Sequence, residues 1–567
     1  MSAPSLVKQP VNTPVPRESS FERERDIHKK LEGIRTDEIF GERGAHDPGF
    51  LKALLLLVPF FKTTYLYIQL VIHESGRYFS WLSATWAITI TEIFSGHPFV
   101  DPVSYLFFVI GGTLVLPVVL ILCLVARFPP LTRLYYAWSR LFGGGLGIVN
   151  SGNANFFKAL TKKQVEAAKM ELHRGFGESK PDRECPPNEN ARVFDYDIAK
   201  LLLQIAAVVY EHESTDIRNA AFGTAGHKSL EFLEATGDGF IRTFAKQFNI
   251  EYHPISELEN KSSAFGGLFW DPDETWIIVA LKGTGPIEFG EWLSDLDSTM
   301  TDCSEYIPNF KMVHRGFKER VFPNKGRLPS QQQHQRPYNT ISLGIQAVAN
   351  HLHARHPDRK VNVWFTGHSL RCATASLIYA RMLMKPEEIG DHAVLRDAYL
   401  FAAPIVCDSD SVKAFNDKMF ADTPERTMWR ITSNDDFVAT GLPEFGDYQH
   451  LFDPKALQKV ESQANNFFYA HLGAEIILYD RPSPSTVAGN HLTNGHPVQL
   501  HSYHFTPEEI SKAYDKQKSK LGETVREKIG VVLQLIPVLG RFIAHSTVTF
   551  RTNLTVLRSV NASGLYT

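Results

Sequence analysis

The chain contains few of the residues that mark a disulfide scaffold or a metal site. Its 567 residues include only five cysteines, which are scattered and form no CxxC pair and no zinc-like spacing. We therefore expect buried thiols in a reducing compartment and no metal site. The five cysteines are Cys123, Cys185, Cys303, Cys372 and Cys407.

An excess of charge of one sign is also missing. The chain has 59 basic and 62 acidic residues, a formal net charge of -3, and no recognisable RNA- or DNA-binding motif. Proteins that bind nucleic acid need a basic surface that neutralises phosphates. We therefore expect no nucleic acid among the partners of this protein.

The first part of the chain lacks the apolar core of a cleavable signal peptide. Residues 1–48 are instead rich in charge and proline, as in "VKQPVNTPVPRESSFERERD". A segment with so little apolar surface gains little from burial to offset the entropy lost on folding. We expect a disordered polar tail over residues 1–48.

Apolar runs then dominate residues 49–145. "FLKALLLLVPFF" and "YLYIQLVI" are followed by Pro102 to Ala126, a stretch without a charged residue that Arg127 ends. Such a stretch is long enough to cross a hydrocarbon core of about 30 Å as a helix. A spanning helix, a hairpin inserted in a lipid monolayer and a buried core helix all remain open. We expect an α-helical region that associates with a membrane or lipid droplet.

Strands and helices alternate in the second half of the chain, after a connector over residues 146–192. "TWIIVALKGT", "VNVWFTGHS", "AYLFAAP" and "TMWRITS" have the pattern of buried strands, and "LRCATASLIYARMLM" has helical periodicity. This alternation predicts an α/β domain with a mainly parallel sheet over residues 193–567. The polar, Gln- and Pro-rich stretch near 322–340 is expected to be a surface insertion.

The motif "TGHSLRCATAS" lies between such a strand and such a helix. Gly367 and Ser369 match the nucleophile elbow Gly-x-Ser-x-Gly, in which a serine stands at the tip of a tight strand-to-helix turn. Arg371 occupies the position of the second glycine of that motif. The pattern predicts Ser369 as a nucleophile, and it predicts that Arg371 must either find space or push the helix away.

A nucleophilic serine also needs a base, an acid that orients the base, and donors to an oxyanion. Thr284 at the end of "ALKGT" and the backbone N–H of Leu370 are candidate donors, and Asp435 or Asp436 is a candidate acid. The residues alone do not choose the base. Its candidates are His450, His491, His496, His501, His504 and His545.

Together these motifs resemble the class 3 (fungal-type) lipases, and most closely the membrane-anchored seed oil-body triacylglycerol lipases of that family. The resemblance runs from about Leu131 to the C-terminus. It rests on "LKGT", "EWLSDLD", "VHRGF", "GHSLRCA" and "LFAAPIVCD". It implies an α/β-hydrolase fold that needs no metal and no organic cofactor.

The resemblance also assigns roles. "NDDFVATGLP" makes Asp436 the acid, and "IPVLGRFIAHSTVTFRTNL" makes His545 the base, with His501 as the second candidate. Ser369 is then the nucleophile, and Thr284 and Leu370 form the oxyanion hole. Two positions depart from the family pattern, since Lys282 replaces an arginine and Arg371 replaces a glycine.

The function that this resemblance implies is ester hydrolysis of triacylglycerols or related acylglycerols. The reaction is expected at a membrane or lipid-droplet surface, on a droplet or the endoplasmic reticulum, with the catalytic domain in the cytosol. Because of Arg371, reduced activity and an inactive lipid-droplet scaffold remain alternatives, as does an esterase or phospholipase of the same fold. The sequence predicts no oligomeric state.

Overall fold

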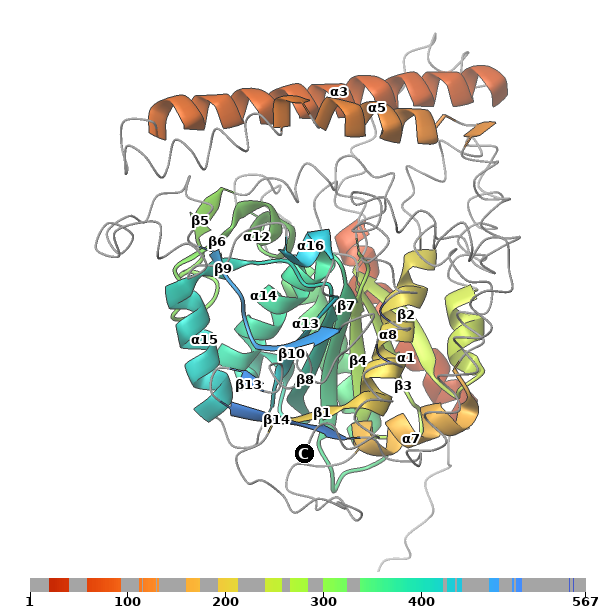
Figure 1. The fold of residues 1–567 in the computed structure, drawn as a ribbon. Coiled ribbons are helices and arrows are strands. Elements are labelled where there is room, and N and C mark those ends of the chain that lie inside the picture. Colours follow the sequence, from red (N-terminus) through yellow and green to blue (C-terminus); the bar gives the residue numbers. More distant parts are fainter. Residues whose placement is uncertain are drawn as a thin grey trace, which may run out of the picture.

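Figure 1 shows the computed structural model of the chain, which describes part of each region expected from the sequence. The described residues are 20–39, 59–92, 112–114, 116–128, 130–131, 160–173, 192–212, 240–256, 266–283, 299–323, 337–421, 426–433, 436–440, 469–478, 492–493, 496–501, 550 and 554.

A seven-stranded sheet forms the centre of the α/β domain, in the order β12-β10-β8-β7-β4-β3-β2. Five neighbouring strands, from β12 to β4, are parallel, and β3 and β2 continue the sheet antiparallel. This mixed, mostly parallel sheet confirms the predicted fold class and fits an α/β-hydrolase. The strands are β2 (Glu251–Ser256), β3 (Gly266–Trp270), β4 (Trp276–Leu281), β7 (Val361–His368), β8 (Ala393–Phe401), β10 (Met428–Ser433) and β12 (Ala474–Leu478).

Both faces of this sheet are buried, which explains why its strands are apolar throughout. In β4, Ile277, Val279 and Leu281 belong to one hydrophobic cluster. The alternate residues of the same strand, Trp276, Ile278 and Ala280, belong to a second cluster on the other face. A period of two within an unbroken apolar run is expected for a central strand.

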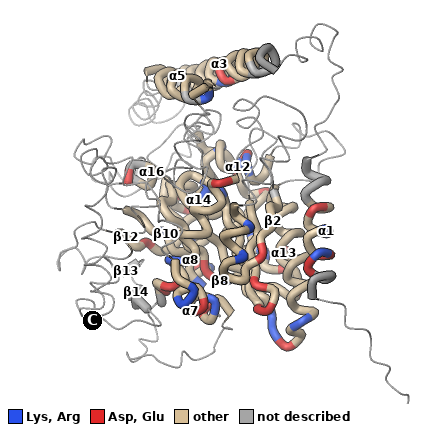
Figure 2. Tube along the Cα trace, turned by 90° about the vertical axis from the view of Figure 1, so that its right-hand side faces the viewer, with Lys and Arg blue, Asp and Glu red and all other residues tan. Residues whose placement is uncertain are grey.

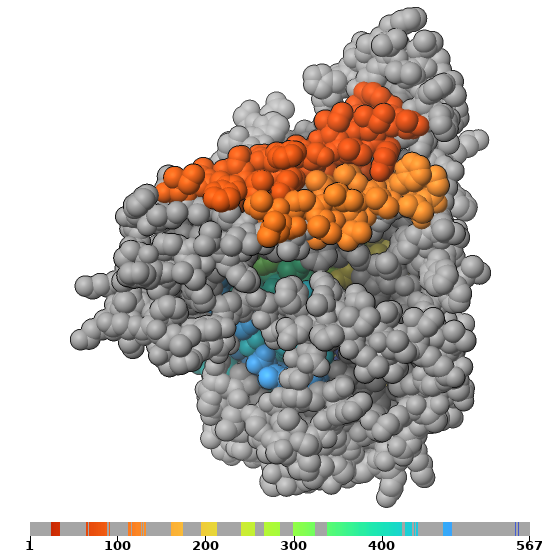
Figure 3. All heavy atoms as spheres, turned by 45° about the horizontal axis from the view of Figure 1, so that its top comes forward, coloured from red at the N-terminus to blue at the C-terminus, as the bar shows by residue number. Residues whose placement is uncertain are grey.

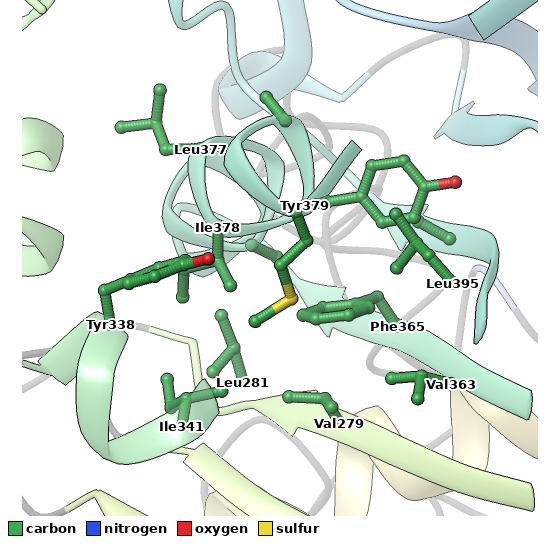
Figure 4. Close-up of a cluster of buried hydrophobic side chains, with 14 of the residues drawn as sticks. Val279, Leu281, Tyr338, Ile341, Val363, Phe365, Leu377, Ile378, Tyr379 and Leu395 are labelled. Atoms are coloured by element: carbon green, nitrogen blue, oxygen red, sulfur yellow. The ribbon is translucent and has the colours of Figure 1, made fainter. Parts of the chain in front are cut away.

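Helices cover each face. α13 (Pro337–His353) and α14 (Arg371–Met384) pack on one face, where Tyr338, Ile341 and Ile378 meet the side chains of β4 and β7 (Figure 4). α7 (Lys162–His173) and α8 (Tyr196–Val208) pack on the other. β7 ends at His368 and α14 begins at Arg371. Because α14 packs on the sheet, it fixes the position of the short turn that joins it to β7.

Two smaller sheets flank the central one. β11 (Tyr469–Ala470), β9 (Cys407–Asp408), β6 (Met312–His314) and β5 (Met300–Asp302) form a four-stranded sheet. β1 (Arg192–Asp195), β14 (His496–His501) and β13 (Leu492–Thr493) form a three-stranded sheet. The short helices α12 (Arg315–Val321), η3 (Val209–Glu211), η6 (Pro386–Ile389) and α16 (Phe437–Thr440) and the longer α15 (Ser409–Ala421) connect these strands.

The N-terminal segment differs from the expected disordered tail. Residues 20–39 form the helix α1 (Ser20–Ile39), which packs against α13 and β2. Ile27 and Leu31, one helical turn apart, enter the main hydrophobic cluster, and Arg355 donates a hydrogen bond to Glu24 over 2.6 Å. Residues 1–48 are polar on average, so their composition did not indicate that Ile27 and Leu31 are buried.

Two boundaries also differ. The expected connector over 146–192 contains α7, whose Val165 and Leu172 are buried in the second cluster. The expected insertion near 322–340 ends earlier, since α13 begins at Pro337 with Tyr338 buried. Residues 324–336 of that stretch lie outside the described residues.

In the apolar N-terminal region, the helices α3 (Pro59–Glu92) and α5 (Leu116–Ala126) pack side by side (Figure 3). Tyr78, Leu116 and Leu120 are buried between them. Of the predicted apolar stretch Pro102 to Ala126, residues 102–111 and 115 lie outside the described part. Within the described residues, the structure contains no helix with both the length and the hydrophobicity that a membrane span requires.

We predict that α1 contributes to the stability of the catalytic domain. Leu31 is fully buried, so Leu31→Ala should lower the free energy of unfolding by about 2 to 4 kcal/mol. Urea unfolding of the detergent-solubilised full chain, followed by intrinsic fluorescence, measures this change. Lys30→Ala, at an exposed position of the same helix, should leave the midpoint unchanged. Identical midpoints for both variants would show that α1 does not support the fold.

Candidate active site

Ser369 lies in the turn that joins the end of β7 to the start of α14. Its φ of 65° is in the left-handed region, which residues other than glycine rarely adopt. Strained turns of this kind cluster at functional sites, and a strand–serine–helix turn is the geometry of a nucleophile elbow. The structure therefore places Ser369 in a strand-to-helix turn, and its role as the nucleophile stays a prediction.

Backbone hydrogen bonds hold this turn on both sides. The N–H of Ser369 donates to the backbone oxygen of Phe401 in β8 over 2.9 Å. The N–H of Cys372 donates to the backbone oxygen of Ser369 over 2.8 Å. Leu370 is the N-cap residue of α14 and has no side-chain cap. A helix N-terminus favours negative charge nearby, so Leu370 lies where an oxyanion would be stabilised.

Arg371 does not push α14 away from the sheet. Its side chain is buried, with 1% exposure. The thiol of Cys372, the next residue, donates to the backbone oxygen of Phe401 over 3.2 Å. A methyl group on Gly367 would meet the Cys372 sulfur at 3.6 Å, an ordinary contact distance. The helix thus remains in contact with β7 and β8, and the expected displacement is not found.

The end of β4 lies against the elbow. A side chain at Gly283 would overlap the hydroxyl of Tyr210 and come within 2.7 Å of the backbone oxygen of His368. Only glycine allows so close an approach of the two backbones. Thr284, the candidate oxyanion donor, directly follows Gly283 but lies outside the described residues.

Asp436 follows β10 and is completely buried. Its carboxylate accepts hydrogen bonds from the N–H groups of Val438 at 2.8 Å and Ala439 at 3.4 Å, at the start of α16. Burial, and in addition the charge of Asp436, raise the pKa of the Cys372 thiol well above its usual range. Ile431 of β10 pairs with Phe401 of β8, which pairs with His368 of β7, so Asp436 and Ser369 both follow strands that end at the same edge of the sheet. Asp435 lies outside the described residues.

The candidate bases are less well placed by the structure. His545 lies outside the described residues. His501 lies in β14, paired with Asp195, the N-cap residue of α8. The opposite end of α8 leads to Tyr210, which touches the elbow, and the 13-residue helix is about 20 Å long. The backbone of His501 is therefore at the far end of α8 from Ser369.

The structure adds site residues that the sequence analysis missed. The Tyr210 hydroxyl is hydrogen-bonded to the ring Nδ1 of His368 at 2.9 Å and donates to the His368 backbone oxygen at 3.3 Å. The ring of Phe550 packs edge-on against His368, with 5.9 Å between centroids. In the sequence, the one feature of Tyr210 is its place at the end of an apolar helix. A tyrosine that is merely buried in the core has the same feature, so the sequence did not indicate a role for Tyr210.

Two solved lipase structures are similar to part of the chain. Lip2 lipase from Yarrowia lipolytica is 17% identical, with a TM-score of 0.27 over 41% of this chain and 67% of that one. Lipase II from Rhizopus niveus is 14% identical, with a TM-score of 0.28 over 50% of this chain and 82% of that one. The fold assignment rests on the sheet described above rather than on these scores. No curated protein sequence matches the chain.

A family profile matches the central part of the catalytic domain. The matched stretch, residues 278–445, begins in β4 and includes the elbow, Asp436 and α16. It includes the positions of Thr284, Ser369, Leu370 and Asp436, and it ends before His545. Over this stretch, with the strained serine turn at its centre, the chain matches the family described as lipase (class 3).

Proposed function

We propose that the protein is a serine lipase that hydrolyses triacylglycerols or related acylglycerols at a membrane or lipid-droplet surface. The observation that carries this proposal is the strained turn at Ser369, with its φ of 65°, inside the stretch that matches the class 3 lipases. Buried Asp436 follows β10 at the edge of the sheet where Ser369 follows β7, as an acid partner must.

The proposed mechanism uses only side chains and backbone groups of the chain. Ser369 attacks the ester carbonyl while His545 takes its proton, and Asp436 holds the imidazole in the required tautomer. The N–H groups of Thr284 and Leu370 stabilise the tetrahedral oxyanion. His545 then protonates the leaving alcohol, and water attacks the acyl-enzyme in the same way. No metal or cofactor takes part in any step.

Phe550 supports the choice of His545 as the base. Phe550 packs against His368, the residue before Ser369, and against Phe401. Five residues of chain span at most about 18 Å, and a bent chain spans less. His545 is therefore no more than about 18 Å of chain from Phe550. The backbone of His501 is paired with Asp195 at the end of α8 opposite Tyr210, and α8 is about 20 Å long.

The exposed surface of α3 and α5 supports a lipid surface as partner. Figure 2 shows few charged residues on the described parts of α3 and α5, and Arg77 of α3 is paired with Glu74 at 3.6 Å. The charges of Glu74 and Arg127 are buried and paired with each other at 3.4 Å. Large exposed apolar areas mark interaction sites, and a lipid surface requires no complementary shape. The exposed apolar residues are Ile68, Ile72, Phe79, Trp86, Ile90, Leu114, Val118, Ile121, Leu122, Val125 and Phe128.

The position of these helices agrees with an interfacial enzyme. Figures 1 and 2 place α3 and α5 on the side of the domain where α12 and α16 lie, and α16 begins directly after Asp436. A lipid surface bound by α3 and α5 would then face the edge of the domain that carries the site. We propose the droplet or endoplasmic reticulum surface as the location, with the catalytic domain in the cytosol.

Buried Arg371 favours a second candidate, an inactive lipase-like scaffold on lipid droplets. Arg371 is buried in the first turn of α14, where the positive end of the helix dipole disfavours a cation. The intact contacts of Cys372 and Ser369 favour the active enzyme instead. An esterase or phospholipase of the same fold differs only in substrate.

The first prediction concerns the triad. Ser369→Ala and Asp436→Asn should each lower hydrolysis of an emulsified triacylglycerol by at least about 1,000-fold, because each removes a member of one catalytic unit. Fatty acid release measured by pH-stat checks this. Asp435→Asn is the matched control and should retain activity within a few-fold. Full activity of Ser369→Ala would exclude the mechanism.

The second prediction concerns Arg371. Because α14 keeps its contacts with β7 and β8, Arg371→Gly should change triacylglycerol hydrolysis by less than about tenfold, which corresponds to 1.4 kcal/mol of barrier. The same assay on the parent chain and the variant, with folding followed by circular dichroism, measures the ratio. A gain well above tenfold would show that Arg371 damages the site. Folded but inert proteins in both cases would favour the scaffold.

The third prediction concerns the lipid surface. Ile72→Glu with Ile121→Glu should weaken flotation with triacylglycerol-loaded artificial droplets at least about tenfold, since two apolar side chains are replaced by charges. Hydrolysis of a soluble short-chain ester should not change. Gln69→Glu adds the same charge at an exposed polar position of α3 and should leave flotation intact. Unchanged flotation of the double variant would rule out this surface.

A further inference from the structure

Tyr210 connects three segments that are far apart in the sequence. It lies in η3, just after α8, and is buried with 4% exposure. α8 packs on β7, where the Thr366 hydroxyl shares its proton between the Leu202 oxygen of α8 at 3.2 Å and the Tyr399 oxygen of β8 at 3.0 Å. The Tyr210 hydroxyl therefore approaches the end of β7 from a rigidly placed helix.

The hydroxyl has one proton, which decides how its two hydrogen bonds are formed. When the hydroxyl donates to the backbone oxygen of His368 at 3.3 Å, its oxygen accepts from the ring Nδ1–H of the same residue at 2.9 Å. One group thus holds both the side chain and the backbone of His368. This arrangement requires that His368 carries a proton on Nδ1.

The peptide group between His368 and Ser369 is consequently held at both ends. Its oxygen accepts from Tyr210, and its N–H donates to the Phe401 oxygen over 2.9 Å. A peptide group is planar, so fixing both ends fixes its orientation. The Cys372 N–H holds the backbone oxygen of Ser369 on the other side of the turn, and with both sides held Ser369 keeps a φ of 65°, which an unconstrained serine would leave.

The same hydroxyl also lies beside the end of β4. It occupies the space that a side chain on Gly283 would need, next to the His368 oxygen. Gly283 precedes Thr284, the proposed oxyanion donor. The hydroxyl oxygen of Tyr210 therefore contacts both the turn at Ser369 and the end of β4, which we call the oxyanion strand. This contact sets the distance between the turn and the strand.

We infer that Tyr210 is a positioning residue, whose hydroxyl holds the Ser369 turn and the oxyanion strand at the spacing that the transition state requires. It acts through His368 and Gly283 and not on the substrate. This inference rests on the proposed serine hydrolase function. It adds to that function a residue outside the stretch that matches the lipase family, since the match begins at residue 278.

Tyr210→Phe tests the inference because it removes only the hydroxyl. We expect kcat for a soluble p-nitrophenyl ester to fall about ten- to a hundredfold, the effect of misplacing reacting groups by about 1 Å. KM should stay within twofold. The inhibition constant of an alkyl boronic acid, which forms a tetrahedral adduct, should rise by the factor by which kcat/KM falls. The p-nitrophenol burst counts competent sites, so kcat is expressed per competent site.

Tyr379→Phe is the matched control. Tyr379 lies in α14, the helix that follows the Ser369 turn. Its hydroxyl, away from the turn, donates to the Arg396 backbone oxygen over 2.6 Å. This variant should keep the parental kcat per site. A Tyr210→Phe enzyme with parental kcat and boronate affinity per site would overturn the inference and leave the proposed function standing. If Ser369→Ala hydrolyses the ester as the parent does, the proposed function fails and the inference fails with it.

Discussion

The strained backbone of Ser369 is the constraint around which the rest of the catalytic domain is arranged. A serine with φ near 65° relaxes unless the neighbouring chain holds it. Phe401 in β8 holds the amide side of the turn, and Tyr210 holds the carbonyl side. α14 begins after this turn, and its Cys372 lies beside Gly367 in β7 and contacts Phe401 in β8. The order β10-β8-β7-β4 places the Asp436 loop and the oxyanion strand on either side of this turn.

Local patterns predicted the parts of the structure that a single segment determines. The apolar runs of β4, β7, β8 and β10 are unbroken because both sheet faces are buried, so their periodicity alone indicated central strands. Gly367 and Ser369 between a strand and a helix indicated the elbow. Asp436 followed from the resemblance and from its place after a strand.

Long-range contacts account for what the sequence did not predict. Tyr210 meets His368 across 158 residues of sequence, and nothing near either residue indicates the pairing. α1 is polar on average and folds because Ile27 and Leu31 find a partner surface on α13 and β2. The expected effect of Arg371 on the helix was argued from side-chain size. The displacement is not found, because Cys372 contacts β8 and Arg371 is buried without separating α14 from the sheet.

Covalent labelling of the folded chain tests the central claim most directly. Reaction with an alkyl fluorophosphonate, followed by proteolysis and mass spectrometry, locates any adduct. An activated serine reacts with this reagent, while ordinary serines do not, because only a general base and an oxyanion hole accelerate the attack. We expect one adduct per chain, on Ser369, and none after the protein is unfolded. An unlabelled folded chain, or an adduct on another serine, would contradict this account of the site.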